Sequence, residues 1–527
     1  MEEETKKIVQ QAAKKFYAKG YSDAGASLSK RALKGFTAES GHPKEDIDYN
    51  NHILRQRCRM LYMASPIAAG AINTSRTKIV GSGIHLNSSI NYELLGISQD
   101  EARKWQKNTE AEWKLWAENK RNCDSHGMSS FYALEQIALK SWLMSGDVFA
   151  VLKRTKATPL SPYTLRIQLI EADRVRTPSD FGKEYAWSLT DGKNPNTGNK
   201  VYDGVEVDSD GKVVAYCICD TYPFQATATD AKWQRVLAEG ERTGLPNVLQ
   251  IMDAERPDQY RGVSILAVAI EMLLQLRRYT ESELMAALVQ SYLTAWIVTE
   301  SDQSDFPFNE VGGGVDGPEN IEIDSVSDDE NEYEIGPGTI NHLKPGESVV
   351  LGNPNIPTAG FEAFVKALCK MIGAAIEIPY DVLMKEFNSS YSAAKGALEE
   401  AWEMFKMRRA TLVENFCQPV YEVWLAEAIA IGRIKAPGFF NDPKIRKAWC
   451  GARWDGPAQT HLDPVKEAKA NETLVAHGWK TNAQVTRESY GGNFEENISE
   501  LSEEAQLMAQ KMFTPTNNNS QGGEPTE

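Results

Sequence analysis

The sequence lacks the short motifs on which many catalytic sites depend. Its 527 residues contain no G-x-x-x-x-G-K-S/T phosphate loop, no H-E-x-x-H zinc motif and no G-x-S-x-G nucleophile elbow. The seven histidines are isolated from one another along the chain. The sequence therefore does not encode an ATP-driven motor of the usual type, and we expect a protein that is not an enzyme and that needs no cofactor or metal.

Cysteine is scarce and irregularly placed. Seven cysteines, an odd number, are scattered along the chain, which favours reduced thiols over a disulfide framework. Cys217 and Cys219 are two residues apart, so in a strand both thiols face the same side. A zinc site needs four ligands at suitable spacing, and no second pair accompanies these two. We interpret both as part of a buried apolar strand face.

Long hydrophobic runs are also absent. The longest, residues 284–298, contains Gln290 and stays below the roughly 18 residues that can span a bilayer. The N-terminal stretch "MEEETKKIVQQAAKKFYAKGYSD" is amphipathic and lacks the continuous apolar core of a secretory signal. The sequence thus predicts a soluble protein without a membrane partner.

Positive charge is missing from one long segment. Thirteen acidic residues and no Lys or Arg lie between Glu300 and Glu334, so this segment carries most of the net charge of −16. Blocks of like charge are usually solvated loops. The same segment contains a G-x-G-x-x-G pattern at Gly312, Gly314 and Gly317, but its flanks are neither strand nor helix and its acidic surroundings repel phosphate. We interpret the pattern as a flexible loop.

The spacing of apolar residues changes several times along the chain, between the period of a helix and the period of a strand. Apolar content of 42% and charged content of 25% are ordinary for a folded protein, and the length suggests three or four structural units. The spacing of apolar residues predicts helices over 53–80 with a break at Pro66, 101–146, 262–293, 361–377, and 391–431 with a kink at Pro419. Alternating patterns between 147 and 219 predict strands. The expected fold class is α+β and predominantly helical.

The predicted helix at 262–293 is apolar around much of its circumference. A helix that faces water on most sides does not tolerate this composition. Two interpretations remain open from the sequence: the helix packs against neighbouring subunits, or it is buried within its own chain.

The order of several stretches resembles a known family. These include "ERPDQYRGVSILAVAIEMLLQLRRYTESELMAALVQSYLTAWI", "PGTINHLKPGESVVLG" and "IGAAIEIPYDVLMKEFNSSYSAAKGALEEAWEMF". Over roughly residues 45–455, their order is similar to that of the portal proteins of tailed bacteriophages, of the lambda type. None of the stretches is decisive by itself, but their shared order is specific.

The resemblance implies a fold with a mixed α/β wing, a two-helix stem, a small clip that contains β-strands, and a helical C-terminal crown. The segments expected from it are an N-terminal arm at 1–50, the wing at 51–261, a first stem helix at 262–293, the clip at 294–357, a second stem helix at 358–378, a tunnel loop at 379–391, a long kinked helix and return to the wing at 392–455, the crown at 456–513 and a disordered tail at 514–527.

The resemblance also implies two functional segments. The first is a tunnel loop that lines a DNA channel, and it contains Lys385, Glu386, Phe387, Asn388, Ser389, Ser390 and Tyr391. Lys385 is the one loop cation that could reach DNA phosphates, or it is an exposed side chain paired with Glu386 or Asp381. This loop is shorter than the usual family pattern, in which an Asp-x-Ser-x-x-Asn-Tyr-Ser-Ser sequence precedes an Arg.

The second is the acidic segment, which we interpret as an outward clip loop that offers negative charge to basic faces of partner proteins. It contains Asp324, Asp328, Asp329, Glu330, Glu332 and Glu334. The segment is particular to this chain, so the family assigns no role to its individual residues.

The partners that the resemblance implies are about twelve copies of the chain itself in a closed ring, double-stranded DNA bound without sequence preference, the terminase large subunit, head-tail adaptor or completion proteins, and the major capsid and scaffold proteins. The expected location is the portal vertex of a virion, after assembly in the host cytoplasm. Two other functions stay open: a nucleic-acid enzyme such as a nuclease or packaging ATPase, and a non-viral scaffold protein.

Overall fold

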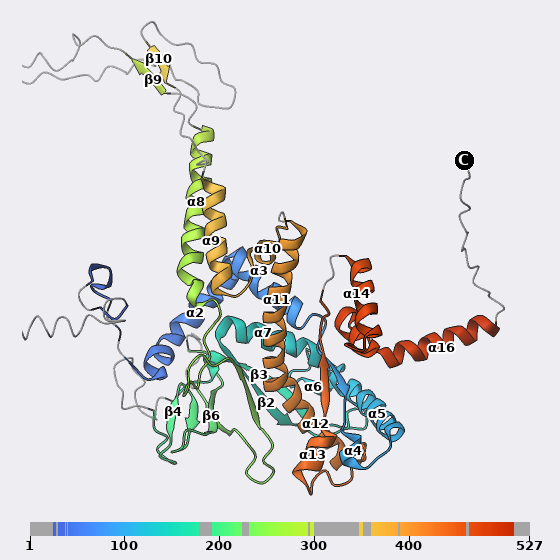
Figure 1. The fold of residues 1–527 in the computed structure, drawn as a ribbon. Helices are drawn as coiled ribbons and strands as arrows, with labels where there is room; N and C mark the ends of the chain where they lie inside the picture. The colour runs from blue at the N-terminus through green and yellow to red at the C-terminus, as the bar shows by residue number, and fades with distance from the viewer. Residues whose placement is uncertain are drawn as a thin grey trace, which may run out of the picture.

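The computed structural model describes residues 25–27, 30–36, 38, 40–178, 192–223, 231–292, 296–299, 347–350, 360–387, 390–459 and 463–510. Within these residues, no helix is both long and apolar enough to cross a membrane. Helices and short antiparallel sheets are mixed, in agreement with the predicted α+β class (Figure 1).

The helical part of the body begins with α2 (Tyr49–Ala64) and α3 (Pro66–Ile79). The predicted break at Pro66 is confirmed, because Ser65 leaves the helical conformation and its hydroxyl accepts a hydrogen bond from the Ala68 N–H. The helices that follow are α4 (Tyr92–Leu95), α5 (Gln99–Ala117), α6 (Lys120–Cys123) and α7 (Phe131–Ser145).

Two antiparallel sheets form the β part of the body. One has the strand order β3-β2-β8, from β2 (Asp147–Arg154), β3 (Leu165–Glu171) and β8 (Val248–Met252). The other has the order β4-β5-β6-β7, from β4 (Lys200–Tyr202), β5 (Val205–Val207), β6 (Val213–Cys219) and β7 (Trp233–Leu237). Cys217 and Cys219 are buried on β6, as expected. All seven cysteines are buried, and none forms a disulfide.

Two helices project from the body as an antiparallel pair (Figure 1). They are α8 (Ile270–Tyr292) and α9 (Phe361–Ala375), and Tyr279 on α8 stacks on Phe361 of α9 with ring centroids 5.5 Å apart. Beyond them, β9 (Trp296–Thr299) pairs with β10 (Glu347–Val350). The sequence predicted a helix from residue 262, and this start is wrong by eight residues because residues 261–264 are held by the body, as described below.

The chain returns to the body through a long interrupted helix. After the short α10 (Tyr380–Met384) come α11 (Tyr391–Leu412), a π-helical turn (Val413–Cys417) and α12 (Gln418–Ala430). At Pro419, where the sequence predicted a kink or a break, the chain keeps the helical conformation: a π turn ends two residues before the proline, whose missing N–H falls in the first turn of α12.

Aromatic side chains from distant segments form the centre of the body. Trp113 lies 5.1 Å from both Phe131 and Trp424 between ring centroids, and Phe131 stacks on Phe416 at 5.4 Å. These residues are fully buried, so α5, α7 and α12 share one core.

The C-terminal part begins with α13 (Pro443–Trp449) and β11 (Ala452–Asp455), which pairs with β1 (His85–Ser88). Three further helices follow at one side of the body, α14 (Pro464–Ala476), α15 (Asn482–Val485) and α16 (Phe494–Gln510) (Figure 1).

Candidate functional site

The expected tunnel loop lies at the base of the projecting pair. Gly373 and Ile378 come so close that a Cβ on the glycine would meet the Ile378 carbonyl oxygen at 2.5 Å, and Glu377 has a φ of 61°. This sharp turn places Pro379 before α10, and Lys385 ends α10 in the left-handed conformation at φ 57°. Five of the expected loop residues therefore form a short helix.

The sequence left open that Lys385 pairs with Glu386 or Asp381, and the structure shows neither ion pair. Glu386 accepts a hydrogen bond from the Tyr380 hydroxyl at 2.8 Å and lies 3.7 Å from the Lys366 ammonium on α9. The hydrogen bond to Glu386 raises the pKa of Tyr380 to about 12. Lys385 is exposed and makes no ion pair with the described residues. Its ammonium is therefore available to an external anion.

The rest of the loop is described in part. Phe387 is half exposed, and Ser390 caps α11 by accepting a hydrogen bond from the Ala393 N–H. Tyr391 is the first residue of α11. Asn388 and Ser389 lie outside the described residues.

The acidic segment, with Asp324, Asp328, Asp329, Glu330, Glu332 and Glu334, also lies outside the described residues. Its flanks are described, because Thr299 pairs with Glu347 across β9 and β10. The two ends of the intervening chain therefore meet at the far end of the projecting pair (Figure 1).

A buried charge network, which the sequence did not predict, lies where the projecting pair joins the body. It consists of Asp48, Arg55, Asp147, Asp203 and Arg261. The Arg261 guanidinium is fully buried and donates two hydrogen bonds to the Asp147 carboxylate, at 2.6 and 3.1 Å. It also donates to the Asp203 carboxylate at 2.6 Å. Two backbone carbonyls, of Val175 and Ala172, accept further hydrogen bonds at 2.8 and 2.9 Å.

The network fixes the segment that leads into α8. Asp147 at the start of β2 also accepts a hydrogen bond from the Gly262 N–H at 3.2 Å, and the Asn51 side chain donates to the Gly262 carbonyl at 3.1 Å. Gly146 and Gly262 touch so closely that a Cβ on either would overlap the carbonyl oxygen of the other. These contacts hold residues 261–264 out of the helix, which explains why α8 begins at Ile270.

The electrostatics of the network depend on burial. Burial by itself would raise the pKa of Asp147, but Arg261 and Arg55 together lower it below its ordinary value. For Asp48 the balance is opposite: burial and the nearby Asp203 raise its pKa to about 7, although Arg261 and Arg55 oppose the rise. Asp48 therefore titrates near neutral pH.

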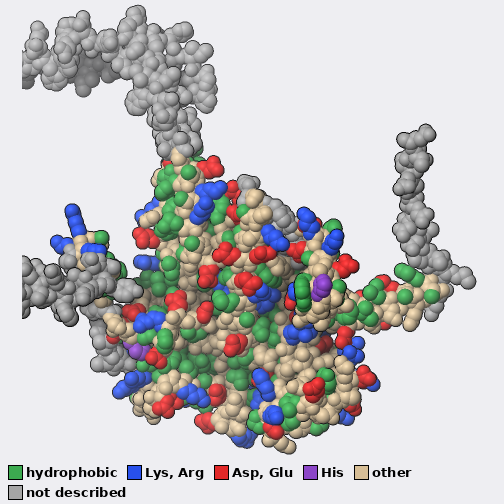
Figure 2. All heavy atoms as spheres, viewed as in Figure 1, with side chains coloured by type: hydrophobic (Ala, Val, Ile, Leu, Met, Phe, Trp, Pro, Cys, Tyr) green, Lys and Arg blue, Asp and Glu red, His purple; other side chains and the backbone are tan. Residues whose placement is uncertain are grey.

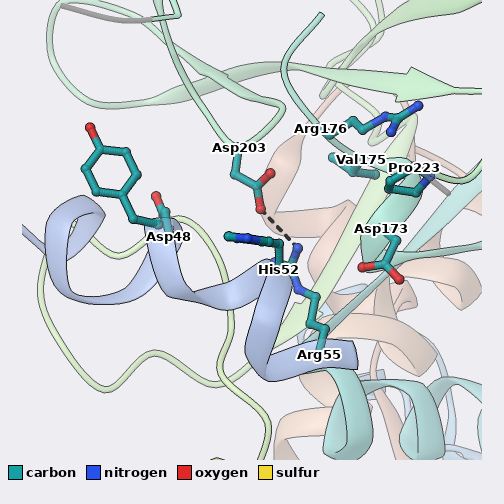
Figure 3. Close-up of a pocket in the computed structure, with 9 residues that line it drawn as sticks. Asp48, His52, Arg55, Asp173, Val175, Arg176, Asp203 and Pro223 are labelled. Atoms are coloured by element: carbon teal, nitrogen blue, oxygen red, sulfur yellow. Dashed lines mark hydrogen bonds and ion pairs between the residues drawn. The ribbon is translucent and has the colours of Figure 1, made fainter. Parts of the chain in front are cut away.

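A cavity of about 260 Å³ opens next to the network (Figure 3). The residues that line it come from α2, from the strand connections and from the preceding turn: Asp48, Tyr49, His52, Arg55, Asp173, Val175, Arg176, Asp203 and Pro223. Arg55 donates to Asp203 across it at 3.0 Å. Both signs of charge alternate around the cavity, and the described residues contain no group of three metal-ligating side chains. The contacts of Arg261 and Asp147 with the segment before α8 give the network a structural role.

Hydrophobic side chains are exposed along the projecting pair, interspersed with charged ones (Figure 2). On α8, Leu284 is 62% exposed and Met285 is 59% exposed, while among residues 270–288 the buried side chains, such as Leu273, lie near the body. On α9, Phe364 and Met371 are about half exposed. Burial within the same chain, one of the two interpretations of this helix, therefore does not account for its outer half.

Comparison with known proteins identifies the family of this chain. A family model described as "Phage portal protein, lambda family" matches residues 29–409. Among curated proteins, portal protein B of Escherichia phage lambda is 24% identical over 79% of this chain and 76% of its own length. The portal protein of Escherichia phage N15 is 23% identical over the same shares. Among solved structures, a chain in the neck of an empty GTA particle has a TM-score of 0.43 at 13% identity, over 83% of this chain and 92% of that chain. Because the family model spans most of the sequence, the chain belongs to the lambda family of phage portal proteins.

Proposed function

We propose that the chain is the subunit of a phage portal, the connector between head and tail, and that it has a structural role instead of an enzymatic one. In this function about twelve copies form a ring at one capsid vertex, and double-stranded DNA passes through the central channel during packaging and ejection. The observation that carries the proposal is the family match over residues 29–409.

The exposed hydrophobic side chains of α8 and α9 support the ring. Covering a side chain such as Leu284 or Met285, each more than half exposed, contributes about 1 kcal/mol. A ring repeats every contact at each subunit boundary, so a modest interface adds up around the circle. In this function α8 and α9 are the two stem helices.

The remaining segments follow from the family. Residues 51–261 and 392–455 form the wing, residues 294–357 the clip and residues 456–513 the crown. The N-terminal arm is 1–50, the tail is 514–527, and the stem segments are 262–293 and 358–378. The antiparallel pairing of β9 with β10 supports a small clip with β-structure at the outer end of the stem.

The channel has to hold DNA weakly. Each phosphate that a Lys or Arg neutralises adds a counterion-release contribution to affinity, and a ring multiplies that contribution by its number of subunits. The tunnel loop, Lys385 to Tyr391, provides one available cation per subunit in Lys385, while Glu386 is bound to Tyr380 and Lys366. Sparse cations let the duplex slide.

The acidic clip loop is the proposed docking site for basic faces of the terminase large subunit and later of head-tail completion proteins. The major capsid and scaffold proteins are the partners at the vertex, and assembly takes place in the host cytoplasm before the portal becomes part of the virion. Replacing the thirteen acidic residues between 300 and 334 by Asn or Gln is expected to weaken terminase binding and to reduce its salt dependence. Unchanged binding and unchanged salt dependence would contradict this role.

Electron microscopy of the purified full-length protein tests the proposed function directly. We expect rings with a central hole. A protein that stays monomeric at micromolar concentration, with no rings in negative stain, would refute it. Deleting Phe387 to Ser390 is expected to leave the rings intact and to impair DNA translocation; loss of the rings in this variant would instead point to a packing role for the loop.

A further inference from the structure

Arg55 on α2 is a buried cation whose hydrogen-bonding groups are only partly used. Its side chain is 3% exposed, and its Nη1 donates a hydrogen bond to the Asp203 carboxylate at 3.0 Å. Its Nε and Nη2 have no hydrogen-bond partner among the described residues, and the Asp147 carboxylate lies 3.9 Å from Nη2, beyond hydrogen-bonding distance. Buried N–H groups are rarely left unpaired, because they lose their hydrogen bonds to water on folding. The unused donors of Arg55 therefore indicate a ligand.

The cavity beside the network is the space from which a ligand can reach Arg55. Arg55 is one of its lining residues, and Figure 3 shows Asp48 on one side of the Arg55 side chain and Asp173 and Arg176 on the other. The cavity volume of about 260 Å³ lies below the roughly 300–1,000 Å³ of pockets that hold drug-sized ligands. The cavity therefore suits a small molecule.

Two carboxylates that line the cavity are already held by arginines. Asp203 accepts hydrogen bonds from Arg55 at 3.0 Å and from Arg261 at 2.6 Å. Asp173 pairs with Arg59 at 2.7 Å. Because these arginines compensate both negative charges, the two carboxylates repel an incoming anion less than unpaired carboxylates do.

Arg176 and Asp48 also line the cavity, and together they favour one negative charge in it. Arg176 makes no ion pair with any residue that the structure describes. Its guanidinium donates a hydrogen bond to the Cys219 sulfur at 3.3 Å and lies 5.1 Å from the centre of the Trp233 ring, and its Nε lacks a hydrogen-bond partner within the described part of the chain. Asp48 is protonated and neutral below its pKa of about 7. One negative charge in the cavity therefore balances Arg176.

We propose that this cavity binds a small carboxylate anion, which accepts hydrogen bonds from Nε and Nη2 of Arg55. These two nitrogens lie along one edge of the planar guanidinium and match the two oxygens of a carboxylate. Arg261 holds the Asp147 carboxylate with the same two nitrogens, at 2.6 and 3.1 Å. A carboxylate carries the single negative charge that Arg176 leaves uncompensated, whereas a phosphate dianion carries one charge too many. The site is separate from the proposed portal function, so neither proposal depends on the other.

The protonation of Asp48 makes this binding depend on pH. The charged and titratable groups around Asp48 are Asp203, Asp147, Arg55, Arg261, Tyr202, Tyr49, Lys44 and His52. Above its pKa, the ionised Asp48 repels a second carboxylate. The neutral fraction of Asp48 falls from about 0.9 at pH 6 to about 0.1 at pH 8, so the dissociation constant of the anion is expected to rise about tenfold over this range.

Ligand-observed NMR of the full-length protein tests the proposal, with sodium acetate as the probe and sodium chloride added to keep the ionic strength constant. Saturation transfer from the protein to the acetate methyl group is expected at pH 6, with a dissociation constant about tenfold higher at pH 8. In Asp48→Asn the dissociation constant is expected to be the same at both pH values. Protonation of His52 would change the affinity in the same direction, so a pH dependence that persists in Asp48→Asn would overturn the role of Asp48.

Two variants test the arginines. Arg55→Lys keeps the charge and removes the pair of nitrogens, so it should weaken acetate binding by at least about tenfold. Arg277→Lys on α8 is the matched control, because this arginine is 45% exposed and pairs with Glu281, and it should bind acetate as the wild type does. Arg176→Gln removes the uncompensated charge without changing the buried network, so it should also weaken binding, and it replaces Arg55→Lys if the melting curve shows that this variant does not fold.

A wild-type protein that gives no saturation transfer at pH 6 would overturn the proposal. Acetate binding that is unchanged in folded Arg55→Lys or in Arg176→Gln would overturn it as well. In each case the proposed portal function would stand, because ring formation is measured separately by electron microscopy.

Discussion

Replacing Arg261 by Met should weaken the attachment of the projecting pair, α8 and α9, to the body far more than the loss of one exposed charge would. The Arg261 and Asp147 side chains are both 0% exposed and lie 2.6 Å apart. Without Arg261, the Asp147 carboxylate keeps only Arg55 as a cation, at 3.9 Å. Removing one partner of a buried ion pair destabilises a protein by about 3–5 kcal/mol. For a cooperative unit of 150–250 residues, this corresponds to a decrease in melting temperature of about 10 °C.

The chain offers a matched control on the stem itself. Arg277 on α8 pairs with Glu281 at 2.8 Å, but the two side chains are 45% and 60% exposed. Arg277→Met is therefore expected to change stability by less than about 0.5 kcal/mol. Differential scanning calorimetry of the purified variants would measure both effects, and limited proteolysis would show whether cleavage concentrates between body and stem.

A third variant distinguishes the effect of losing the ion pair from the effect of losing the packing of the Arg261 side chain. Arg261→Met/Asp147→Asn removes the buried charge that the single variant leaves behind, so it should recover part of the lost melting temperature. If Arg261→Met melts within 2 °C of the wild type, or no lower than Arg277→Met, the buried network does not stabilise the joint and the reasoning is wrong.

Three further predictions follow from burial and exposure. The pKa of Asp48 is about 7 in the folded protein and near 4 when unfolded, so the folded state binds the extra proton and stability falls as pH rises from about 4 to about 7. Asp48→Asn should flatten this profile and, above pH 7, raise the free energy of unfolding by about 4 kcal/mol, which a higher melting temperature would show; an unchanged profile would contradict the assignment. Glu135 is fully buried, its pKa is raised well above the ordinary value by burial, and it accepts a hydrogen bond from the Ile84 N–H at 2.7 Å. Glu135→Gln should stay within about 1 kcal/mol of wild type at pH 7, whereas Glu135→Leu should lose about 1–3 kcal/mol by orphaning that N–H; equal melting of the two variants would refute this. Leu284→Asp/Met285→Asp should abolish ring formation, as measured by size-exclusion chromatography with light scattering, while the melting temperature of the single chain stays near that of the wild type. If the variant still forms rings, these two residues do not belong to the interface.

Sequence reasoning succeeded where the determinants are local. The break at Pro66 was predicted because proline lacks the N–H that continues a helix, wherever the chain goes afterwards. The burial of Cys217 and Cys219 was also predicted correctly, but their side of β6 is not purely apolar, because the Arg176 guanidinium donates a hydrogen bond to the Cys219 sulfur at 3.3 Å.

It failed where the determinants are far apart in the chain. The start of α8 was placed at residue 262 because the apolar pattern continues without interruption through that region. The segment before α8 is kept out of the helix by Arg261, whose partners Asp147 and Asp203 are 114 and 58 residues away in the sequence. No periodic pattern connects these residues, and the positive φ of Asp203, 42°, was seen only in the structure. The charge network could therefore be found only from the fold.

The geometry of the stem makes it a lever. The 23 residues of α8 extend about 34 Å from a pivot only a few residues wide, formed by the Gly146–Gly262 contact and Arg261. A tilt of about 3° at that pivot displaces the outer end of α8 by about 2 Å. In the ring proposed above, a concerted tilt of all subunits would change the width of an opening between these ends by about 4 Å. Small angular differences at a glycine contact thus become differences in aperture, which makes the stiffness of the pivot the mechanical quantity to measure.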